Sequence, residues 1–200
     1  MKFILLLVSY LIGSISWAII LGKIFCKKDI RDFGSGNAGA TNVLRTFGKN
    51  FAIATLILDV LKGFIPSMIG YKLFGDAGLL LAGIGAVCGH NWPIYFNLKG
   101  GKGVATSLGV FIAVSPLFVL VLAIVFFTTV ASSKMVSLGS IAAAVASIIQ
   151  GIYYLATKRY EKAILLIVIG SIVIWRHKSN INRIRMGQES KLGKKWLFMI

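Results

Sequence analysis

Six long apolar runs dominate the chain and restrict what it can fold into. They cover residues 3–25, 51–74, 77–88, 104–131, 136–157 and 163–175. A helix needs about 20 apolar residues to cross the hydrocarbon core of a bilayer. Because 57% of the 200 residues are hydrophobic, against about 45–50% in soluble domains, one small soluble core cannot bury them. The sequence therefore predicts an all-α, multi-pass transmembrane helical bundle, with one domain over residues 1–200.

The run 104–131 decides the number of predicted spans. It is too long for one ordinary span, and Ser115-Pro116 lies near its middle. Proline lacks a backbone N–H and disfavours helix at the preceding residue, so one kinked helix and two short helices both fit. We favour the split, which gives seven spans and puts most basic residues on one side. The positive-inside rule then places that side and the C-terminus in the cytoplasm, and the N-terminus outside.

Charge narrows the choice of partners. The chain has 22 Lys and Arg against 6 Asp and Glu, a formal net charge of +16. These residues are dispersed among apolar runs, and no recognition module is visible, so we expect no nucleic-acid partner. We expect the basic loops to face anionic membrane lipids. Cys26 and Cys88 have no ligand-like spacing, so neither a metal nor a disulfide is expected.

Three polar segments interrupt the apolar pattern, at residues 34–45, 89–103 and 176–189. Glycine leaves backbone N–H groups accessible to a ligand, and Arg, Lys and Asn add further donors. Since carboxylates are scarce in these segments, the ligand they favour is an anion, above all phosphate. With seven spans, all three segments fall on the cytoplasmic side.

The first polar segment is the richest in donors. A short helix from Thr41 would place Thr41 and Arg45 on one face, and its N-terminus could face an anion. A glycine-rich turn with Asn and Ser caps is the structural alternative, but the donors without carboxylates favour a binding site. The candidate residues are Gly34, Ser35, Gly36, Asn37, Gly39, Thr41, Asn42 and Arg45.

The second polar segment sets Lys102 in a glycine frame, which suits an ammonium held close to phosphate. A Walker A loop requires Ser or Thr after the lysine, but Gly103 stands there, so we exclude an ATPase. A histidine in this position would, taken alone, be interpreted as a capping or packed residue. The candidate residues are His90, Gly100, Gly101, Lys102 and Gly103.

In the third polar segment, His177, Asn180 and Arg183 repeat at helical spacing. We expect Glu189 to pair with a nearby base.

A charged pair lies inside the apolar run 51–74. Asp59 and Lys62 are three residues apart and can share a helix face. Charges within a membrane are costly and normally face the protein interior. A structural ion pair and a contribution to the site both fit, and we favour the structural pair.

In order and spacing, the three segments resemble the bacterial acyl-phosphate:glycerol-3-phosphate acyltransferase family of integral membrane proteins. The sequence departs from the family pattern at three places, Ala38, Asn97-Leu98 and Lys134-Met135. Only the last departure weakens a role, that of the turn 132–135. The matching stretches are residues 34–45, 89–93, 99–106 and 177–181, with Arg183, Gly187 and Glu189.

The resemblance implies a seven-span protein of the bacterial plasma membrane, with its active site facing the cytoplasm. It implies transfer of a fatty acyl group from acyl phosphate to the 1-hydroxyl of sn-glycerol 3-phosphate, the first acylation of phospholipid synthesis. The products would be lysophosphatidate and phosphate, and no cofactor is expected. It also suggests the catalytic centre: Ser35, Arg45, Lys102, His177 and Asn180.

The implied reaction needs an acceptor for the hydroxyl proton. Soluble-type glycerolipid acyltransferases use a His-x-x-x-x-Asp base, which is missing at both histidines of this chain. Our hypothesis is that the leaving phosphate takes the proton, while the protein supplies position and charge stabilisation. We assign Arg45 and Lys102 to phosphate oxygens and Ser35 to a nearby donor. His177 and Asn180 would orient glycerol phosphate or the acyl carbonyl.

Two other classes of function remain open. A phosphate or organic-phosphate transporter explains the donors, but it predicts polar residues along a route, and Asp59 with Lys62 is the only clear charged pair at depth. A lipid-binding scaffold explains the basic face but not the glycine frames. The sequence leaves the acyl-chain preference and the oligomeric state undetermined.

Overall fold

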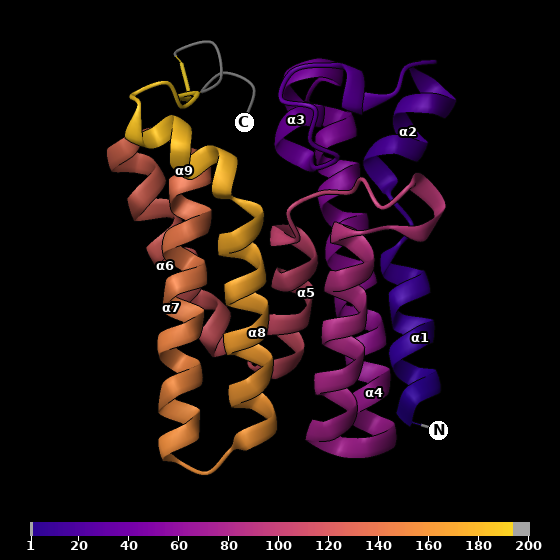
Figure 1. Ribbon diagram of the computed structural model, residues 1–200, viewed down its shortest axis with the longest axis vertical. Helices are drawn as coiled ribbons and strands as arrows, with labels where there is room; N and C mark the ends of the chain where they lie inside the picture. The colour runs from indigo at the N-terminus through magenta and orange to yellow at the C-terminus, as the bar shows by residue number, and fades with distance from the viewer. Residues whose placement is uncertain (1, 194–200) are drawn as a thin grey trace. The chain divides into compact units, whose positions relative to one another are not determined.

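The computed structural model describes residues 2–193, and these residues form helices and connecting loops without a strand (Figure 1). The all-helical prediction is therefore confirmed. The helices are α1 (Lys2–Gly13), α2 (Trp17–Phe25), α3 (Ala40–Phe47), α4 (Lys49–Asn91), α5 (Val104–Val114), α6 (Pro116–Ser133), α7 (Val136–Ala156), α8 (Tyr160–Arg176) and α9 (Lys178–Arg185), with 3-10 turns η1 (Ile30–Asp32) and η2 (Ile94–Phe96).

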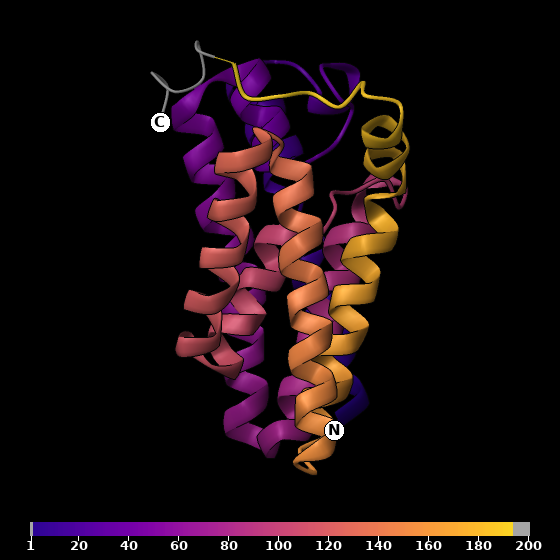
Figure 2. The ribbon, with the colours of Figure 1, turned by 90° about the vertical axis from the view of Figure 1, so that its left-hand side faces the viewer.

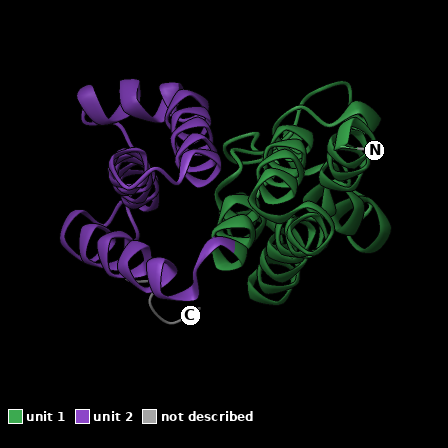
Figure 3. Cartoon of the chain, turned by 90° about the horizontal axis from the view of Figure 1, so that it is seen from below, with its two compact units in different colours: residues 1–113 green, residues 114–200 purple. Residues whose placement is uncertain are grey.

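The chain divides into two compact units, Met1–Ala113 and Val114–Ile200, which Figure 3 shows in separate colours. The first unit contains the first two polar segments, and the second unit contains the third. The assignment of residues 1–200 to one domain stays a prediction.

In the first unit, α4 is a helical hairpin and not one straight rod. Phe74 (φ −140°, ψ 17°) and Gly75 (φ 61°, ψ −147°) leave the helical region, and the chain doubles back there (Figure 1). Gly75 has the positive φ that glycine tolerates best. A Cβ on Gly70 or Gly78 would collide with the facing backbone carbonyl of the other arm. The two arms therefore correspond to the separate apolar runs 51–74 and 77–88.

Glycines also let the neighbouring helices approach this hairpin. At Gly13, Gly85 and Gly89, a Cβ would meet backbone atoms across the contact between α1 and the second arm of α4. At Gly63 and Gly109, a Cβ would meet backbone atoms across the contact between the first arm of α4 and α5. Small residues permit such close packing of helices in membranes, where no water-driven force holds them together.

In the second unit, α7 and α8 run side by side in opposite directions (Figure 2). Gly151 and Gly170 lie at their contact, where a Cβ would meet side-chain and backbone atoms of the facing helix. The unit begins with a break: α5 ends at Val114, and Ser115 caps α6 by accepting a hydrogen bond from Phe118 N–H at 3.3 Å. The predicted division of the run 104–131 at Ser115-Pro116 is confirmed.

Helix length and apolar composition indicate how many segments can cross a membrane. Among residues 2–193, four segments are long and apolar enough to cross a membrane: Lys2–Phe25, Lys49–Phe96, Pro116–Ser133 and Val136–Ala156. A fifth follows if Tyr160–Arg176 and Lys178–Arg185, bent by 55°, form one span. The seven-span topology and the sidedness of the termini stay predictions.

Candidate functional site

The first polar segment forms a loop that Asn42 holds from α3. Its buried side chain accepts a hydrogen bond from Ser35 N–H (2.9 Å) and donates to the carbonyl oxygens of Phe33 (2.9 Å) and Ile30 (3.2 Å). Gly34 has φ +58°, and a Cβ there would collide with Asn42 Oδ1. The Asn42 amide therefore shapes the loop from inside and leaves Ser35 exposed at its surface.

The short helix expected after this loop is confirmed as α3. It begins after Gly39, which is its N-cap, with Thr41 in the first turn and Arg45 in the last. Val43 is buried in the core of the first unit, so α3 is anchored by its apolar face. Thr41 and Arg45 are both partly exposed, as a contact with a ligand requires.

The second polar segment folds back over the end of α4. Gly101 N–H donates to the carbonyl of His90 at 3.1 Å. A Cβ on Gly100 would collide with the same carbonyl, and one on Gly101 would collide with His90 Nε2. From α1, Tyr10 Oη donates to the carbonyl of Trp92 at 2.8 Å. The glycines at 100 and 101 are therefore required by close packing against His90.

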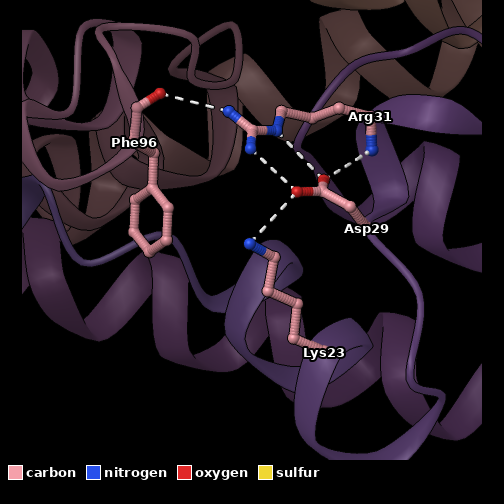
Figure 4. A network of polar contacts seen from close by, with 4 residues as sticks. All are labelled: Lys23, Asp29, Arg31 and Phe96. Atoms are coloured by element: carbon pink, nitrogen blue, oxygen red, sulfur yellow. Dashed lines mark hydrogen bonds and ion pairs between the residues drawn. The ribbon is translucent and has the colours of Figure 1, made fainter.

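These two segments, distant in sequence, meet within the first unit. Gly101 lies between the His90 ring and the carbonyl of Ala38, at both of which a Cβ would be too close. Arg31 Nη1 donates to the carbonyl of Phe96 at 3.1 Å (Figure 4). The structure thus brings Gly36, Asn37 and the rest of the first segment to the loop that carries Lys102.

Arg31 is itself held by a carboxylate. Its Nε donates to Asp29 Oδ1 (3.0 Å) and its Nη2 to Oδ2 (2.8 Å), while Lys23 Nζ lies 3.5 Å from Oδ2 (Figure 4). The side-chain hydrogen bonds from Arg31, aided by its charge and that of Lys23, lower the pKa of Asp29 from 3.8 to about 2. Asp29 therefore stays ionised and remains hydrogen-bonded to Arg31 at any physiological pH.

A buried cluster of charged groups lies beside the second segment. Lys62 Nζ is 2.8 Å from Asp59 Oδ1 and donates to the carbonyl of Ile15 at 2.7 Å. His90 Nδ1 is 3.7 Å from the same carboxylate oxygen. The side chains of all three residues are at most 4% exposed. The predicted pairing of Asp59 with Lys62 is confirmed.

Sequence reasoning did not find His90 beside this pair. A signal was present, because Asp59 lies 16 residues before Gly75 and His90 lies 15 residues after it. Once Gly75 is recognised as the turn of a helical hairpin, the nearly equal separations place both residues at about the same level. The carboxylate missing from the sequence motif around His90 thus comes from the other arm of α4.

The third polar segment forms α9 and the chain after it, in the second unit. Glu189 collects three hydrogen bonds, from Ser137 Oγ (2.7 Å), Asn180 Nδ2 (2.7 Å) and Arg183 Nε (2.8 Å). The expected pairing of Glu189 with a base is confirmed. These bonds, with one from Leu192 N–H to the Lys134 carbonyl at 2.7 Å, pack the segment over the turn between α6 and α7.

Electrostatics explain why Glu189 stays ionised in this position. Partial burial opposes its charge, but the hydrogen bonds from Ser137, Asn180 and Arg183 outweigh burial and hold the pKa of Glu189 below its ordinary 4.5.

The His177 ring, at the start of the same segment, is buried, with Nδ1 2.8 Å from the Val173 carbonyl. Because a carbonyl only accepts, Nδ1 carries the proton, and in the neutral ring Nε2 is the acceptor.

The donors and acceptors around the polar segments indicate which kind of ligand they suit. Among residues 2–193, no group of three or more His, Cys, Asp and Glu side chains is placed to hold a metal ion. Three carboxylates near the polar segments are engaged by basic side chains: Asp29 by Arg31, Asp59 by Lys62 and Glu189 by Arg183. Asp32, just before the first segment, is exposed. Oxygens of a phosphate are acceptors that suit backbone N–H groups and basic side chains.

Comparison with known proteins gives a consistent result. Residues 3–187 match the profile of the family described as glycerol-3-phosphate acyltransferase. A glycerol-3-phosphate acyltransferase of Finegoldia magna is 44% identical over 191 residues, 96% of each chain. Another, of Thermoanaerobacter pseudethanolicus, is 47% identical over 190 residues, 94% of each chain.

Solved structures agree in fold over the full length. The crystal structure of PlsY, an integral membrane glycerol 3-phosphate acyltransferase, in its glycerol 3-phosphate form superposes with a TM-score of 0.91 at 38% identity. It covers 100% of this chain and 99% of that one. The lysophosphatidic acid form of PlsY gives a TM-score of 0.87, also at 38% identity.

Proposed function

Because the chain belongs to the glycerol-3-phosphate acyltransferase family, we propose that it acylates the 1-hydroxyl of sn-glycerol 3-phosphate with acyl phosphate as donor. The hydroxyl oxygen forms an ester bond with the acyl carbon, the bond from that carbon to the phosphate oxygen breaks, and the hydroxyl proton leaves on the phosphate. The products are lysophosphatidate and inorganic phosphate. The family places this reaction in phospholipid synthesis.

The observation that carries the proposal is the meeting of two donor-rich segments in the first unit. The contact of Gly101 with Ala38 and the bond from Arg31 to Phe96 hold them together. Both substrates carry phosphate, so a site rich in backbone and side-chain donors suits them. The solved relatives in glycerol 3-phosphate and lysophosphatidic acid forms support the same acceptor and product here.

We assign roles to the polar residues on this basis. Arg45 and Lys102 bind phosphate oxygens, and Ser35 donates from the exposed surface of the first loop. His177 and Asn180 orient glycerol phosphate or the acyl carbonyl. The remaining candidates supply backbone or side-chain donors, or shape the loops that do: Gly34, Gly36, Asn37, Gly39, Thr41, Asn42, His90, Gly100, Gly101, Gly103 and Arg183.

The proton is taken by the substrate in this scheme. Both ring nitrogens of His90 face protein groups, Nε2 against Gly101 and Nδ1 beside Asp59, so we assign it to supporting the loop. The phosphate that leaves the acyl carbon accepts the proton of the reacting hydroxyl in this scheme. Catalysis then rests on positioning and on stabilising negative charge as it moves to the leaving phosphate.

The protein acts as a multi-pass membrane protein, and we place its active site on the cytoplasmic face of the bacterial plasma membrane, where the basic loops meet anionic lipid. The structure supports a transporter function less well than an acyltransferase function. The deep pair Asp59 and Lys62 is buried, and Lys62 is bound to the carbonyl of Ile15, so it is not exposed as the lining of a route would be.

One assay tests the proposal. Purified protein in detergent receives radiolabelled glycerol 3-phosphate with acyl phosphate, and in parallel with acyl-CoA or acyl-carrier protein. We expect labelled lysophosphatidate only in the reaction that contains acyl phosphate as the donor. Product formed only with another donor would overturn the donor assignment. Uptake of label into sealed vesicles without acylated product would overturn the enzymatic function.

Lys102→Ala is the variant that addresses the site directly. Removing one preorganised donor from a charge-stabilising site typically costs about 10²–10³-fold in rate. We expect a loss of that size in kcat/KM, measured in the same assay. Lys99→Ala, an exposed basic residue of the same segment, is the matched control. Full activity in Lys102→Ala would contradict the assigned role.

A further inference from the structure

The buried charges of Asp59, Lys62 and His90, here called the charge cluster, connect the hairpin α4 to the glycine loop of residues 100–103. We propose that Asp59 is a positioning residue of the acyltransferase. Acting through His90, it holds the glycine loop in the shape that binds a substrate phosphate, and Lys62 cancels its charge. The inference rests on the proposed function and deepens it.

The first step is the position of the His90 ring. One edge, at Nδ1, lies 3.7 Å from Asp59 Oδ1. The other edge, at Nε2, faces Gly101 so closely that a Cβ there would collide with it. The ring therefore stands between the carboxylate and the loop, and any rotation of the ring changes the surface on which Gly101 rests.

The second step is the protonation pattern of the ring. The negative charge of Asp59, 3.7 Å from Nδ1, favours the form that carries its proton on Nδ1. In the neutral ring this leaves the Nε2 lone pair directed at the backbone of the glycine loop. Without Asp59, the ring loses the group that selects this tautomer and orientation.

The third step explains Lys62. An unpaired carboxylate beside an anion-binding loop would repel the phosphate that the loop binds, and a buried charge is screened less than one in water. Lys62 Nζ, 2.8 Å from Asp59, neutralises that charge. Its further bond goes to the carbonyl of Ile15 at 2.7 Å, in the break between α1 and α2. The cluster can therefore orient His90 without repelling the ligand.

Other buried polar residues on the same helix behave differently. Thr55 and Ser67 donate only to carbonyls one turn back in α4, those of Phe51 and Gly63, both at 2.7 Å. Asp59 and Lys62 instead reach the second arm of α4 and the break after α1. A buried ion pair is weak evidence for stability, since apolar residues of similar volume often replace it without loss. Its contact with His90 and the glycine loop points to positioning.

The test is a double substitution that removes both charges and keeps the volume, Asp59→Asn with Lys62→Met. We expect thermal stability close to that of the unaltered protein. We expect KM for glycerol 3-phosphate to rise about tenfold or more, because small displacements of a binding loop are amplified in this way, with a smaller change in kcat. Ser67→Ala, equally buried on the same helix, is the control and should leave both constants unchanged.

A second variant tests whether the effect passes through His90. His90→Asn leaves the ion pair intact but withdraws the ring from Gly101, so KM should rise by a similar factor. In that background, Asp59→Asn with Lys62→Met should add little, because positions that act through one contact are not additive. Independent, multiplying effects would overturn the proposal, and so would an unchanged KM in either variant. If the double substitution does not fold, His90→Asn alone decides.

The outcomes separate this inference from the proposed function. An unaltered protein that makes no lysophosphatidate overturns the proposed function, and the same variants are then compared by equilibrium binding of radiolabelled glycerol 3-phosphate. An active unaltered protein whose KM is indifferent to Asp59, Lys62 and His90 overturns only the positioning role.

Discussion

The first and third polar segments are held in place by opposite means. In the first unit, a neutral amide, that of Asn42, and the close approach of Gly101 to His90 and Ala38 shape the loops. In the second unit, a single carboxylate, that of Glu189, gathers the side chains around α9. Steric fit and neutral bonds do not respond to pH, and the Asp29 carboxylate that holds Arg31 stays ionised because its pKa is lowered to about 2. The Glu189 anchor of the second unit does respond to acid. The two regions should therefore fail under different perturbations.

Gly101→Ala should produce the largest effect. The new Cβ would collide with His90 Nε2 and approach the Ala38 carbonyl, so the glycine loop must move away from the first segment. We expect kcat/KM to fall at least about 10²-fold, since a displacement near 1 Å can have that effect. Tyr95→Ala, an exposed residue of the same segment, should stay within about twofold. Near-normal activity in Gly101→Ala would show that steric fit is not what shapes this region.

Asn42→Ala should come next. It removes three hydrogen bonds made by a buried amide, while the carbonyls of Phe33 and Ile30 keep their backbone bonds from Gly36 N–H and Phe33 N–H. A hydrogen bond contributes about 0.5–1.5 kcal/mol net, so we expect the free energy of unfolding to fall by about 2 kcal/mol and activity by about tenfold. Chemical denaturation and the acylation assay measure the two. Asn182→Ala, an exposed amide on α9, is the matched control, and equal effects at both positions would contradict the holding role of Asn42.

Arg31→Lys should have a smaller effect. Lysine keeps the charge but lacks the planar fork that binds Asp29 and the Phe96 carbonyl together. Because the network is partly exposed, its worth is about 0.5–1 kcal/mol. We expect a few-fold rise in KM for glycerol 3-phosphate and little change in kcat. An unaltered KM would indicate that the contact of Gly101 with Ala38 is enough to join the two segments.

Acidification should produce the smallest effect, an increase in amide exchange in the third polar segment but not in the first. The pKa of Glu189 is lower in the folded chain than its ordinary 4.5. Its stabilising contribution is therefore complete above pH 4.5 and is lost as pH falls through the folded pKa. Between pH 7 and pH 4, amide exchange corrected for its intrinsic pH dependence should begin to rise around α9, but not at Ser35. Glu189→Gln should abolish the difference, and loss of protection at Ser35 first would refute it.

Local signals in the sequence were sufficient for several elements. Ser115-Pro116 marked the break before α6, the spacing of Thr41 and Arg45 indicated α3, and that of His177 and Asn180 indicated α9. Each depends on residues within a few positions of one another, where propensity and capping act. For Asn42, the sequence indicated a ligand contact from the donor and acceptor of its side chain. It did not indicate that the amide binds the backbone of the first loop, as the structure shows.

Contacts between distant residues could not be predicted in the same way. The pairing of His90 with Asp59 depends on the turn at Gly75, and the bond from Arg31 to Phe96 depends on how two loops pack. Neither has a periodic signature, since each partner lies on a different element. The Asp59–Lys62 pair was predictable because both residues are on one helix; its connection to the glycine loop was not.

By itself, the sequence determined that the chain is helical and rich in lipid-compatible spans, and that its donors suit phosphate. Composition and short-range spacing carry that information, because burial of apolar side chains and helix periodicity are local or additive properties. Only the tertiary structure decided which donors hold loops and which face outward, and that a carboxylate stands beside His90. Those outcomes depend on a reversal of α4 and on close backbone packing at glycines, where a single added carbon changes which segments can meet.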